Sequence, residues 1–428
     1  MGNVSDQLPI DDFLAGYGRF GVQLGLSRIE ALLDRLGNPQ NQVPIVHVAG
    51  TNGKGSVCAY VASVLAAAGY RVGRYTSPHL VNWNERICIN QQTITDADLW
   101  HQLTTVAAAI GVDDSETPTQ FEVFTAAAWL YFAAQSVDIA VIEVGLGGRL
   151  DATNVCPEPL VSAIVSLSRE HWQRLGPTLA DIAREKAGVI KPGRPVVIGP
   201  LPPEADPVVR QRAAALNCPL YEVEPAAGAG PWRSGLGDNV LTYESGLLGE
   251  HQRVNSGVAI AILQLLQQQG WSISTEAIQQ GMAQTQWPGR LQWHTWQGRP
   301  LLLDGAHNTA AAQVLRRYVD RLSPPTTWLM GMLATKDHRD IFTALLRPGD
   351  SLHLVPVPGH QSAAPAELAR LAQAVCPELA VCQTHPALEQ GLSAALRQPT
   401  SKAPDAPVVF CGSLYLIGEF LRRFEPSG

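Results

Sequence analysis

The chain has 428 residues, of which 46% are hydrophobic and 16% are charged, and its formal net charge is −7. This length favours two or three domains, and the composition is that of a globular protein with buried cores. The acidic balance argues against a protein that coats nucleic acid, and no run of about 20 apolar residues is present to cross a bilayer. We therefore expect neither a nucleic-acid partner nor a membrane partner.

The amino-terminal residues and the cysteines bear on where the protein works. The first thirteen residues, MGNVSDQLPIDDF, have no basic stretch followed by an apolar one, so we expect no signal peptide. The seven cysteines are scattered along the chain and form no Cys-x-x-Cys pair. Such spacing is typical of reduced thiols and does not suit a zinc site. The sequence therefore predicts a cytoplasmic protein.

The first part of the chain alternates between short apolar runs and helical stretches. The clearest example is the apolar run at 43–49, which a glycine-rich turn joins to a helical stretch from Lys54 to Ala68. Continuous hydrophobicity of this kind is typical of parallel strands that are covered on both faces. We expect further strands at 137–144, 160–167 and 195–199, and helices at 27–36, 96–110, 121–135, 178–187 and 251–268. Between 200 and 246, a high content of Pro, Gly and Ala leaves the pattern hard to interpret.

A change in composition marks a domain boundary. The segment 284–299 combines Pro, Gly and three Trp, and placing the boundary there gives domains 1–290 and 291–428. Beyond it we expect strands at 300–304, 327–331, 351–356, 379–382 and 407–411, and helices at 308–321, 338–346, 364–374, 386–397 and 413–423. Strands that alternate with helices indicate a mostly parallel sheet with helices on both faces. The sequence therefore predicts an α/β protein.

The glycine-rich turn at 47–56, HVAGTNGKGS, has the parts of a phosphate-binding loop. Glycines let main-chain N–H groups turn toward phosphate oxygens, Lys54 adds a positive charge, and Ser56 offers a hydroxyl to Mg²⁺ at the helix start. It is not a strict Walker A loop, because Val48 and Gly55 stand where Gly and Ser or Thr are required. The alternative is a glycine-rich connection with a solvated lysine.

Two polar side chains follow the apolar runs at 137–144 and 160–167. Glu143 ends the first run, and ligands bind at the carboxyl ends of strands in open α/β sheets, so Glu143 is a candidate Mg²⁺ ligand. The alternative is a structural glutamate that is held by Arg149. His171 follows the second run, and its spacing suits a metal ligand and a helix cap equally.

Lys186 continues the apolar face formed by Leu179, Ile182 and Ala183 in the expected helix. A lysine on such a face must extend to solvent, find a partner or lose its charge. A neutral lysine amine can react with CO₂ to form a carbamate that binds Mg²⁺. From the residues alone, a side chain that extends to solvent is favoured.

Eight motifs lie in one order along the chain: AGTNGKGS at 49–56, YTSPHL at 75–80, ERI at 85–87, FE at 121–122, EVGLGGRLDATN at 143–154, EKAG at 185–188, PGRL at 288–291 and DGAHN at 304–308. With these motifs, the chain from about residue 10 to 420 closely resembles the folylpolyglutamate synthase/dihydrofolate synthase family of the Mur ligase superfamily. The resemblance implies an N-terminal P-loop ATPase-like domain with a mostly parallel sheet flanked by helices, and a smaller Rossmann-like C-terminal domain that completes the glutamate ligase.

The resemblance also implies an activity. An ATP-dependent ligase of this family converts a folate carboxylate to an acyl phosphate, which the amino group of L-glutamate then attacks. The small-molecule partners are then ATP, L-glutamate and a folate or dihydropteroate, and the protein is expected to be a monomer. The GLGGRLDATN motif resembles that of bifunctional bacterial members, which act on folate and on dihydropteroate. Alternatives are a folylpolyglutamate synthase only, another Mur-type amino-acid ligase, or a nucleotide-binding module without catalysis.

The resemblance assigns roles to individual residues. It implies that ATP is held by Asn52, Gly53, Lys54, Gly55 and Ser56. A first Mg²⁺ would be held by Ser56 and Glu143, and a second by His171 and a carbamylated Lys186. The catalytic residues would be Lys54, His171 and Lys186. Further ATP contacts would be Asn255, Arg290, Asp304 and His307. The folate or pteroate pocket would include Ser77, Pro78, His79, Phe121, Glu122, Arg149 and Asp151. Lys336, Asp337 and Ser413 would border the glutamate or nucleotide.

Structural alternatives exist for three of these residues. Asp304 could cap the helix that opens near Asn308, Phe121 could be a core residue, and Pro78 could shape a turn. The chain also departs from the family pattern, because Glu170 stands where Asp is usual and the segment 166–170, SLSRE, is more polar than usual.

Overall fold

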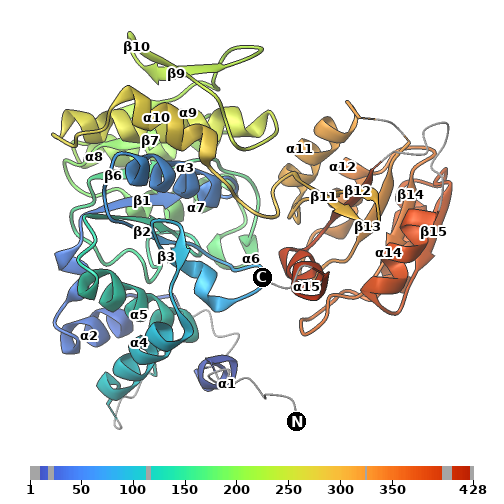
Figure 1. Ribbon diagram of the computed structural model, residues 1–428, viewed down its shortest axis with the longest axis horizontal. Coiled ribbons are helices and arrows are strands. Elements are labelled where there is room, and N and C mark those ends of the chain that lie inside the picture. Colours follow the sequence, from blue (N-terminus) through green and yellow to red (C-terminus); the bar gives the residue numbers. More distant parts are fainter. Residues whose placement is uncertain (1–9, 18–23, 112–116, 323–324, 398–406, 425–428) are drawn as a thin grey trace. The chain divides into compact units, whose positions relative to one another are not determined.

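The computed structural model describes residues 10–17, 24–111, 117–322, 325–397 and 407–424 (Figure 1). Residues 1–9, on which much of the signal-peptide expectation rests, lie outside them. The chain forms two compact units. The first unit comprises Met1–His79, Trp83–Gly246 and Gln252–Gln286, and the second comprises Leu80–Asn82, Leu247–His251 and Trp287–Gly428. Two short segments of the predicted first domain, Leu80–Asn82 and Leu247–His251, thus belong to the second unit, which the sequence did not indicate.

The first unit is built on an eight-stranded sheet with the order β4-β3-β2-β5-β1-β6-β7-β8. Neighbours from β2 to β8 are parallel, whereas β3 and β4 add an antiparallel edge. The strands are β1 Ile45–Ala49, β2 Val72–Tyr75, β3 Ile87–Ile89, β4 Gln92–Thr93, β5 Ile139–Glu143, β6 Val161–Ile164, β7 Val196–Ile198 and β8 Leu220–Glu222. A separate antiparallel hairpin joins β9 Trp232–Leu236 to β10 Asn239–Tyr243. The segment 200–246 was hard to interpret because β8 and this hairpin are mostly only partly buried and carry no continuous apolar pattern.

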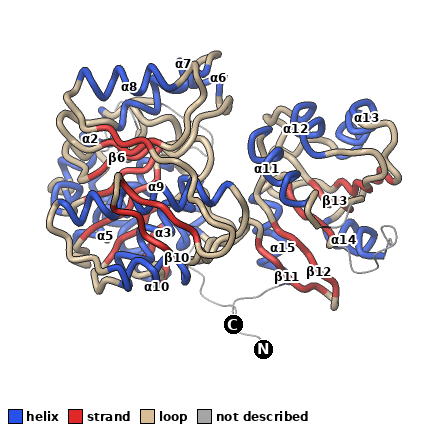
Figure 2. Tube along the Cα trace, turned by 90° about the horizontal axis from the view of Figure 1, so that it is seen from above, coloured by secondary structure: helices blue, strands red, loops and turns tan. Residues whose placement is uncertain are grey.

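Helices cover both faces of this sheet (Figure 2). The helices of this unit are α1 Ile10–Ala15, α2 Ser27–Arg35, α3 Lys54–Ala67, α4 Asp96–Ala109, α5 Gln120–Ala134, α6 Trp172–Leu175, α7 Leu179–Lys186, α8 Asp206–Ala215, α9 His251–Gln268 and α10 Thr275–Gln284, with short 3₁₀ helices at Pro39–Gln42, Trp83–Arg86 and Ala187–Val189. Helix α3 lies on β1, β2 and β5 and packs against α10. Among the described residues, none of the helices is long and apolar enough to span a membrane.

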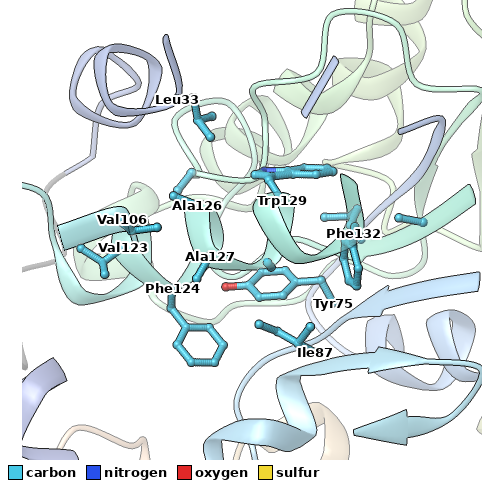
Figure 3. Close-up of a cluster of buried hydrophobic side chains, with 14 of the residues drawn as sticks. Leu33, Tyr75, Ile87, Val106, Val123, Phe124, Ala126, Ala127, Trp129 and Phe132 are labelled. Atoms are coloured by element: carbon cyan, nitrogen blue, oxygen red, sulfur yellow. The ribbon is translucent and has the colours of Figure 1, made fainter. Parts of the chain in front are cut away.

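Helix α5 carries the largest part of one core. Figure 3 shows Phe124, Ala127 and Phe132 of α5 facing Tyr75 and Ile87 of the sheet. The helix begins at a capping box in which the Thr119 side chain accepts from the Glu122 N–H, and such a box satisfies N–H groups that lack partners within the helix. Because α5 is apolar around most of its circumference, it is buried between α2, α4 and the sheet.

The second unit has a six-stranded sheet with the order β11-β12-β16-β13-β14-β15, in which only β11 is antiparallel. The strands are β11 Gln292–Trp296, β12 Arg299–Leu303, β13 Thr327–Met330, β14 Ser351–Leu354, β15 Val381–Thr384 and β16 Val408–Cys411. The helices are α11 Thr309–Val319, α12 His338–Leu345, α13 Pro365–Val375, α14 Leu388–Arg397 and α15 Leu414–Phe424. The expected strands and helices of this unit lie within two residues of these bounds, and the predicted α/β class is confirmed. Strand β11 was missed because it lies in the segment that was interpreted as a boundary.

A buried ion pair ties the layers of the second unit together. Arg316 of α11 donates from Nη1 to Asp350 Oδ2 at 2.8 Å, and the side chains are 3% and 1% exposed. Asp350 also accepts from Trp328 Nε1 at 3.0 Å and from Thr326 N at 2.8 Å. These bonds offset the cost of removing the carboxylate from water.

We expect Asp350→Ala to lower the free energy of unfolding of the second unit by about 1–3 kcal/mol, because buried donors of Trp328, Thr326 and Arg316 lose an acceptor, although Arg316 keeps its ion pair with Asp320. Hydrogen exchange of amides in β13 and β14 measures this loss. Glu367→Ala is the control, because Glu367 pairs with Arg370 at 4.0 Å on the surface, where ion pairs contribute little. Similar exchange in the two variants would contradict the assignment.

Candidate active site

The phosphate loop joins β1 to the amino terminus of α3. Gly53 has φ of 87°, and a Cβ atom there would lie 2.2 Å from Asn255 Oδ1, so only glycine fits. The N–H groups of residues 53–56 lie at the start of a helix of 14 residues, where they have no acceptor within the helix. They are therefore able to bind an anion, and the helix dipole favours one there.

Helix α9 packs two amide side chains against this loop. Gln252 Nε2 donates to Ser56 Oγ at 3.3 Å, and Asn255 Nδ2 donates to Gln252 Oε1 at 2.8 Å. Both side chains are buried. The structure thus brings the predicted residue Asn255 to the phosphate loop and adds Gln252, which the sequence analysis missed. Their spacing of three residues within an apolar helix is the signal that could have found Gln252.

Glu143 lies at the carboxyl end of β5, next to the phosphate loop. The residue is 5% exposed. Its Oε1 lies 3.7 Å from Lys54 Nζ, and its Oε2 accepts a hydrogen bond from Ser77 N at 3.1 Å. Arg149, the partner considered from the sequence, instead pairs with Glu185 at 2.8 Å. The buried carboxylate therefore links β5, the loop after β2 and the phosphate-loop lysine.

Lys186 points inward from the end of α7. The residue is 6% exposed, and Nζ donates to Gly50 O in the phosphate loop at 2.8 Å. Burial, together with the positive charge of Lys54, lowers the pKa of Lys186 to about 7, whereas Glu170 and Asp151 act in the opposite direction. From the residues alone we expected this side chain to extend to solvent. That expectation is wrong, because the side chain is buried.

His171 has a different setting. It is exposed and precedes α6 with φ of 51°, and its side chain makes no capping hydrogen bond to that helix. Within the described part of the chain, no three His, Cys, Asp or Glu side chains are grouped so that they alone could hold a metal ion. Any metal ligand set must therefore include other donors, such as hydroxyls, a modified lysine or the substrate.

Several residues assigned to the folate pocket also build the fold. Glu122 forms the capping box of α5, and its Oε1 pairs with Arg28 Nη2 at 3.1 Å in a nearly buried ion pair. Asp151 accepts from Leu146 N at 2.8 Å and from Thr153 Oγ1 at 2.5 Å, and burial raises the pKa of Asp151. These carboxylates hold the loops around the site in place.

The other residues assigned to that pocket lie in the loop after β2 and at the start of α5. The Ser77–Pro78 peptide is cis, and His79 Nδ1 accepts from Arg86 Nε at 3.0 Å. The Phe121 ring lies over Gly145, where a Cβ atom would be 2.5 Å from the ring. Because Phe121 is half-buried, it is only partly a core residue.

The predicted ATP residues of the second unit meet at the turn between β12 and α11. Asp304 accepts from Leu291 N and from Ala306 N, both at 2.9 Å, and burial raises the pKa of Asp304. The Arg290 guanidinium lies over Gly305, and His307 Nδ1 lies 2.8 Å from Gly305 O.

The helix-cap alternative for Asp304 is wrong, because Asn308 Oδ1 caps α11 by accepting from Ala311 N at 2.9 Å. Elsewhere in this unit, Lys336 and Asp337 directly precede α12. Ser413 is buried before α15, and its hydroxyl has no hydrogen-bond partner within the described residues.

Residues 290–423 match the family model described as dihydrofolate synthetase, C-terminal domain. Folylpolyglutamate synthase of Lacticaseibacillus casei is 36% identical over 406 residues, which are 91% of this chain and 92% of that protein. The chain belongs to the folylpolyglutamate synthase/dihydrofolate synthase family. The enzymes of this family are ATP-dependent ligases that join L-glutamate to folates, so the family and the enzyme class predicted from the sequence are confirmed.

Other members of the family resemble the chain over nearly its whole length. Dihydrofolate synthetase of Saccharomyces cerevisiae is 35% identical over 94% of this chain and 98% of that protein. The structure of a bifunctional folylpolyglutamate synthase/dihydrofolate synthase with Mn, AMPPNP and L-glutamate bound has a TM-score of 0.83 and 31% identity, covering 97% of this chain and 98% of that one.

For this synthase we expect Gly53→Ala to raise the dissociation constant for ADP by more than about tenfold, because the added Cβ would displace Asn255 and distort the phosphate loop. Gly193→Ala is a matched control, since Gly193 also has positive φ, 68°, but has open space around its Cβ position. Calorimetric titration with ADP measures both. Equal ADP affinity in the two variants would show that the contact with Asn255 is unimportant.

Proposed function

We propose that this protein adds L-glutamate both to a folate and to dihydropteroate through an acyl-phosphate intermediate. One observation carries the proposal: two lysines and a buried glutamate meet at a helix amino terminus that can bind phosphate. Lys54 Nζ lies 3.7 Å from Glu143, and Lys186 Nζ lies 2.8 Å from Gly50 O. The related bifunctional enzyme with Mn, AMPPNP and L-glutamate bound supports the same ligands here.

The nucleotide phosphates bind the N–H groups of Gly53, Lys54, Gly55 and Ser56, and the Lys54 ammonium neutralises part of their charge. In the first unit, Asn255 lies beside this loop and contributes to the nucleotide site. The assignment of Arg290, Asp304 and His307 to ATP stays a prediction from the sequence. Arg290 suits phosphate because a guanidinium donates two parallel hydrogen bonds.

The oxygen donors beside the phosphate loop suit Mg²⁺. A serine hydroxyl and a carboxylate are the ligands that Mg²⁺ prefers, and Ser56 and Glu143 provide them. Glu143 is buried, and its Oε1 lies 3.7 Å from the Nζ of the phosphate-loop lysine, Lys54. Bound Mg²⁺ would neutralise charge on the phosphates. A second ion would be held by His171 and a carbamylated Lys186.

The burial of Lys186 supports its carbamylation. With the pKa of Lys186 lowered to about 7, roughly half of the amine is neutral near pH 7. The neutral nitrogen forms a bond to the carbon of CO₂ and loses a proton, which gives a carbamate with two oxygen donors. Because Nζ lies 2.8 Å from Gly50 O, a carbamate on this nitrogen would lie beside the phosphate loop.

In the reaction, a carboxylate oxygen of the folate or of dihydropteroate attacks the γ-phosphorus of ATP, and the bond to the β–γ bridging oxygen breaks to release ADP. The glutamate nitrogen then attacks the acyl carbon, a proton leaves the nitrogen, and phosphate departs. The residues around the loop contribute mainly by holding the reactants in position and by stabilising negative charge.

Action on both substrates is supported by the loop that follows Glu143. Its sequence, GLGGRLDATN, resembles that of bifunctional members, and Asp151 holds it in a fixed conformation through Leu146 and Thr153. Relatives of similar length bear the name of one activity or of the other, so family membership is compatible with either. A monomeric state and a cytoplasmic location stay predictions from the sequence.

The decisive assay measures ADP release with dihydropteroate or with tetrahydrofolate, each with and without L-glutamate. We expect glutamate-dependent release with both acceptors and at least a hundredfold lower kcat/KM for Lys54→Ala, because the loss of a charge that stabilises the transition state costs roughly that factor. Release with tetrahydrofolate alone would limit the function to a folylpolyglutamate synthase. Nucleotide binding without any glutamate-dependent release would indicate a module without catalysis.

We expect Lys186→Ala to lose activity that short carboxylates such as acetate partly restore, because they replace carbamate oxygens. Lys191→Ala is the control: Lys191 is also partly buried, and burial lowers its pKa, but it donates to Asn154 O away from the phosphate loop. The rate is measured against acetate concentration at fixed ionic strength. Acetate that restores neither variant, or both alike, would contradict carbamylation.

A further inference from the structure

The phosphate loop is held from one side by the segment that follows β6. The parallel pairing of β1 with β6 continues past the strand ends, where Thr51 N donates to Ser166 O at 2.8 Å. One residue further, a side chain replaces the main chain as the partner. The Ser166 hydroxyl accepts from Asn52 N at 3.1 Å and donates to Asn52 O at 2.8 Å. Both main-chain polar groups of Asn52 are therefore bonded to one hydroxyl.

A second hydroxyl makes the reciprocal arrangement. Thr51 Oγ1 accepts from Ser168 N at 3.0 Å and donates to Ser168 O at 3.2 Å. Five hydrogen bonds thus join Thr51 and Asn52 to Ser166 and Ser168, and we call these four residues the loop clamp. Ser168 takes part through its main chain only, because its own hydroxyl is buried without a hydrogen-bond partner in the described part of the chain.

The clamp divides the main-chain N–H groups of the loop into two sets. Those of Thr51 and Asn52 point to Ser166 and are not available to a phosphate. Those of residues 53–56 lie at the start of α3, where they have no acceptor within the helix. The hydrogen bonds of Thr51 and Asn52 hold the loop in the conformation in which the N–H groups of residues 53–56 can bind phosphate. The loop therefore does not have to become ordered when nucleotide binds.

We propose that Ser166 is a positioning residue for ATP, which holds the phosphate loop in its binding conformation through the two main-chain groups of Asn52. The proposal rests on the proposed function, since it takes the loop to bind the ATP phosphates. When only a fraction of molecules has the binding conformation, the apparent dissociation constant rises by the inverse of that fraction. Loss of the clamp therefore weakens nucleotide binding and leaves the folate and glutamate sites unaffected.

The close approach of the two segments supports this role. A Cβ atom at Gly50 would lie 3.3 Å from Ser166 N and 3.3 Å from Val165 Cβ, so a side chain there would fit only if the two segments moved apart slightly. Lys54 Nζ donates to Thr51 O at 3.3 Å, which connects the clamp directly to the phosphate-loop lysine. A shift of Thr51 therefore moves an acceptor of the ammonium group that neutralises phosphate charge.

The test is Ser166→Ala in the full-length protein, titrated calorimetrically with ADP in the presence of Mg²⁺. We expect its dissociation constant for ADP to rise about tenfold, because two hydrogen bonds that hold the loop are lost. The KM values for tetrahydrofolate and L-glutamate are expected to stay within about twofold of wild type, since these sites do not depend on the loop conformation. Ser166→Thr keeps the hydroxyl and is expected to restore ADP affinity.

Ser63→Ala is the matched control. Ser63 lies on α3, the helix that begins at the loop, and its buried hydroxyl donates to Gly281 O at 2.8 Å, so the variant also loses a buried serine hydrogen bond but leaves the clamp intact. We expect unchanged ADP affinity. If Ser166→Ala does not stay folded, Ser166→Cys, in which sulfur bonds hydrogen weakly, carries the same expectation.

Wild-type protein that binds no ADP would overturn the proposed function. If wild type binds ADP, a folded Ser166→Ala protein with wild-type affinity would overturn the clamp alone, as would equal losses of affinity in Ser166→Ala and Ser63→Ala.

Discussion

The Lys54 ammonium and the Glu143 carboxylate lie 3.7 Å apart in a setting where both side chains are mostly removed from water, 15% and 6% exposed. A charge in such a setting is tolerated only with a partner, and the surrounding groups follow from that requirement. Glu143 takes a main-chain donor from Ser77, and Lys186 binds a main-chain oxygen of Gly50 and has its pKa lowered. The negative charge of a nucleotide would therefore be met by the Lys54 ammonium and by the N–H groups at the start of α3, with Mg²⁺ beside Ser56 and Glu143.

The parallel sheet explains why these groups meet. Strands β1 and β5 are neighbours and run in the same direction, so the phosphate loop after β1 and Glu143 at the end of β5 open at the same edge. Strand β6 lies on the other side of β1, and its continuation supplies Ser166 and Ser168 to the loop clamp. A phosphate loop between two neighbours can be held from both sides, which a loop at a sheet edge cannot.

Carboxylates that build the fold lie close to those assigned to the chemistry. Glu122 begins α5 and pairs with Arg28, while Asp151 fixes the loop after Glu143. Because a buried carboxylate with several donors has a fixed orientation, the same bonds that stabilise these loops also determine the shape of the surface that the loops form. A substitution at either residue is expected to change both stability and substrate affinity, and the two effects must be measured separately.

The sequence by itself determined the α/β class, most element bounds and the family, because apolar runs of strand length, helical stretches and ordered motifs are local patterns. It also identified Lys54, Glu143 and Lys186 as residues of interest. Only the tertiary structure decided that Lys186 turns inward to Gly50, that Arg149 pairs with Glu185, and that Asn308 rather than Asp304 caps α11. Gln252 and Ser166 were not found, since each contacts the phosphate loop from more than 100 residues away in sequence. Such contacts depend on which strands become neighbours and on how much water is excluded between them, and neither quantity is contained in the pattern of a single segment.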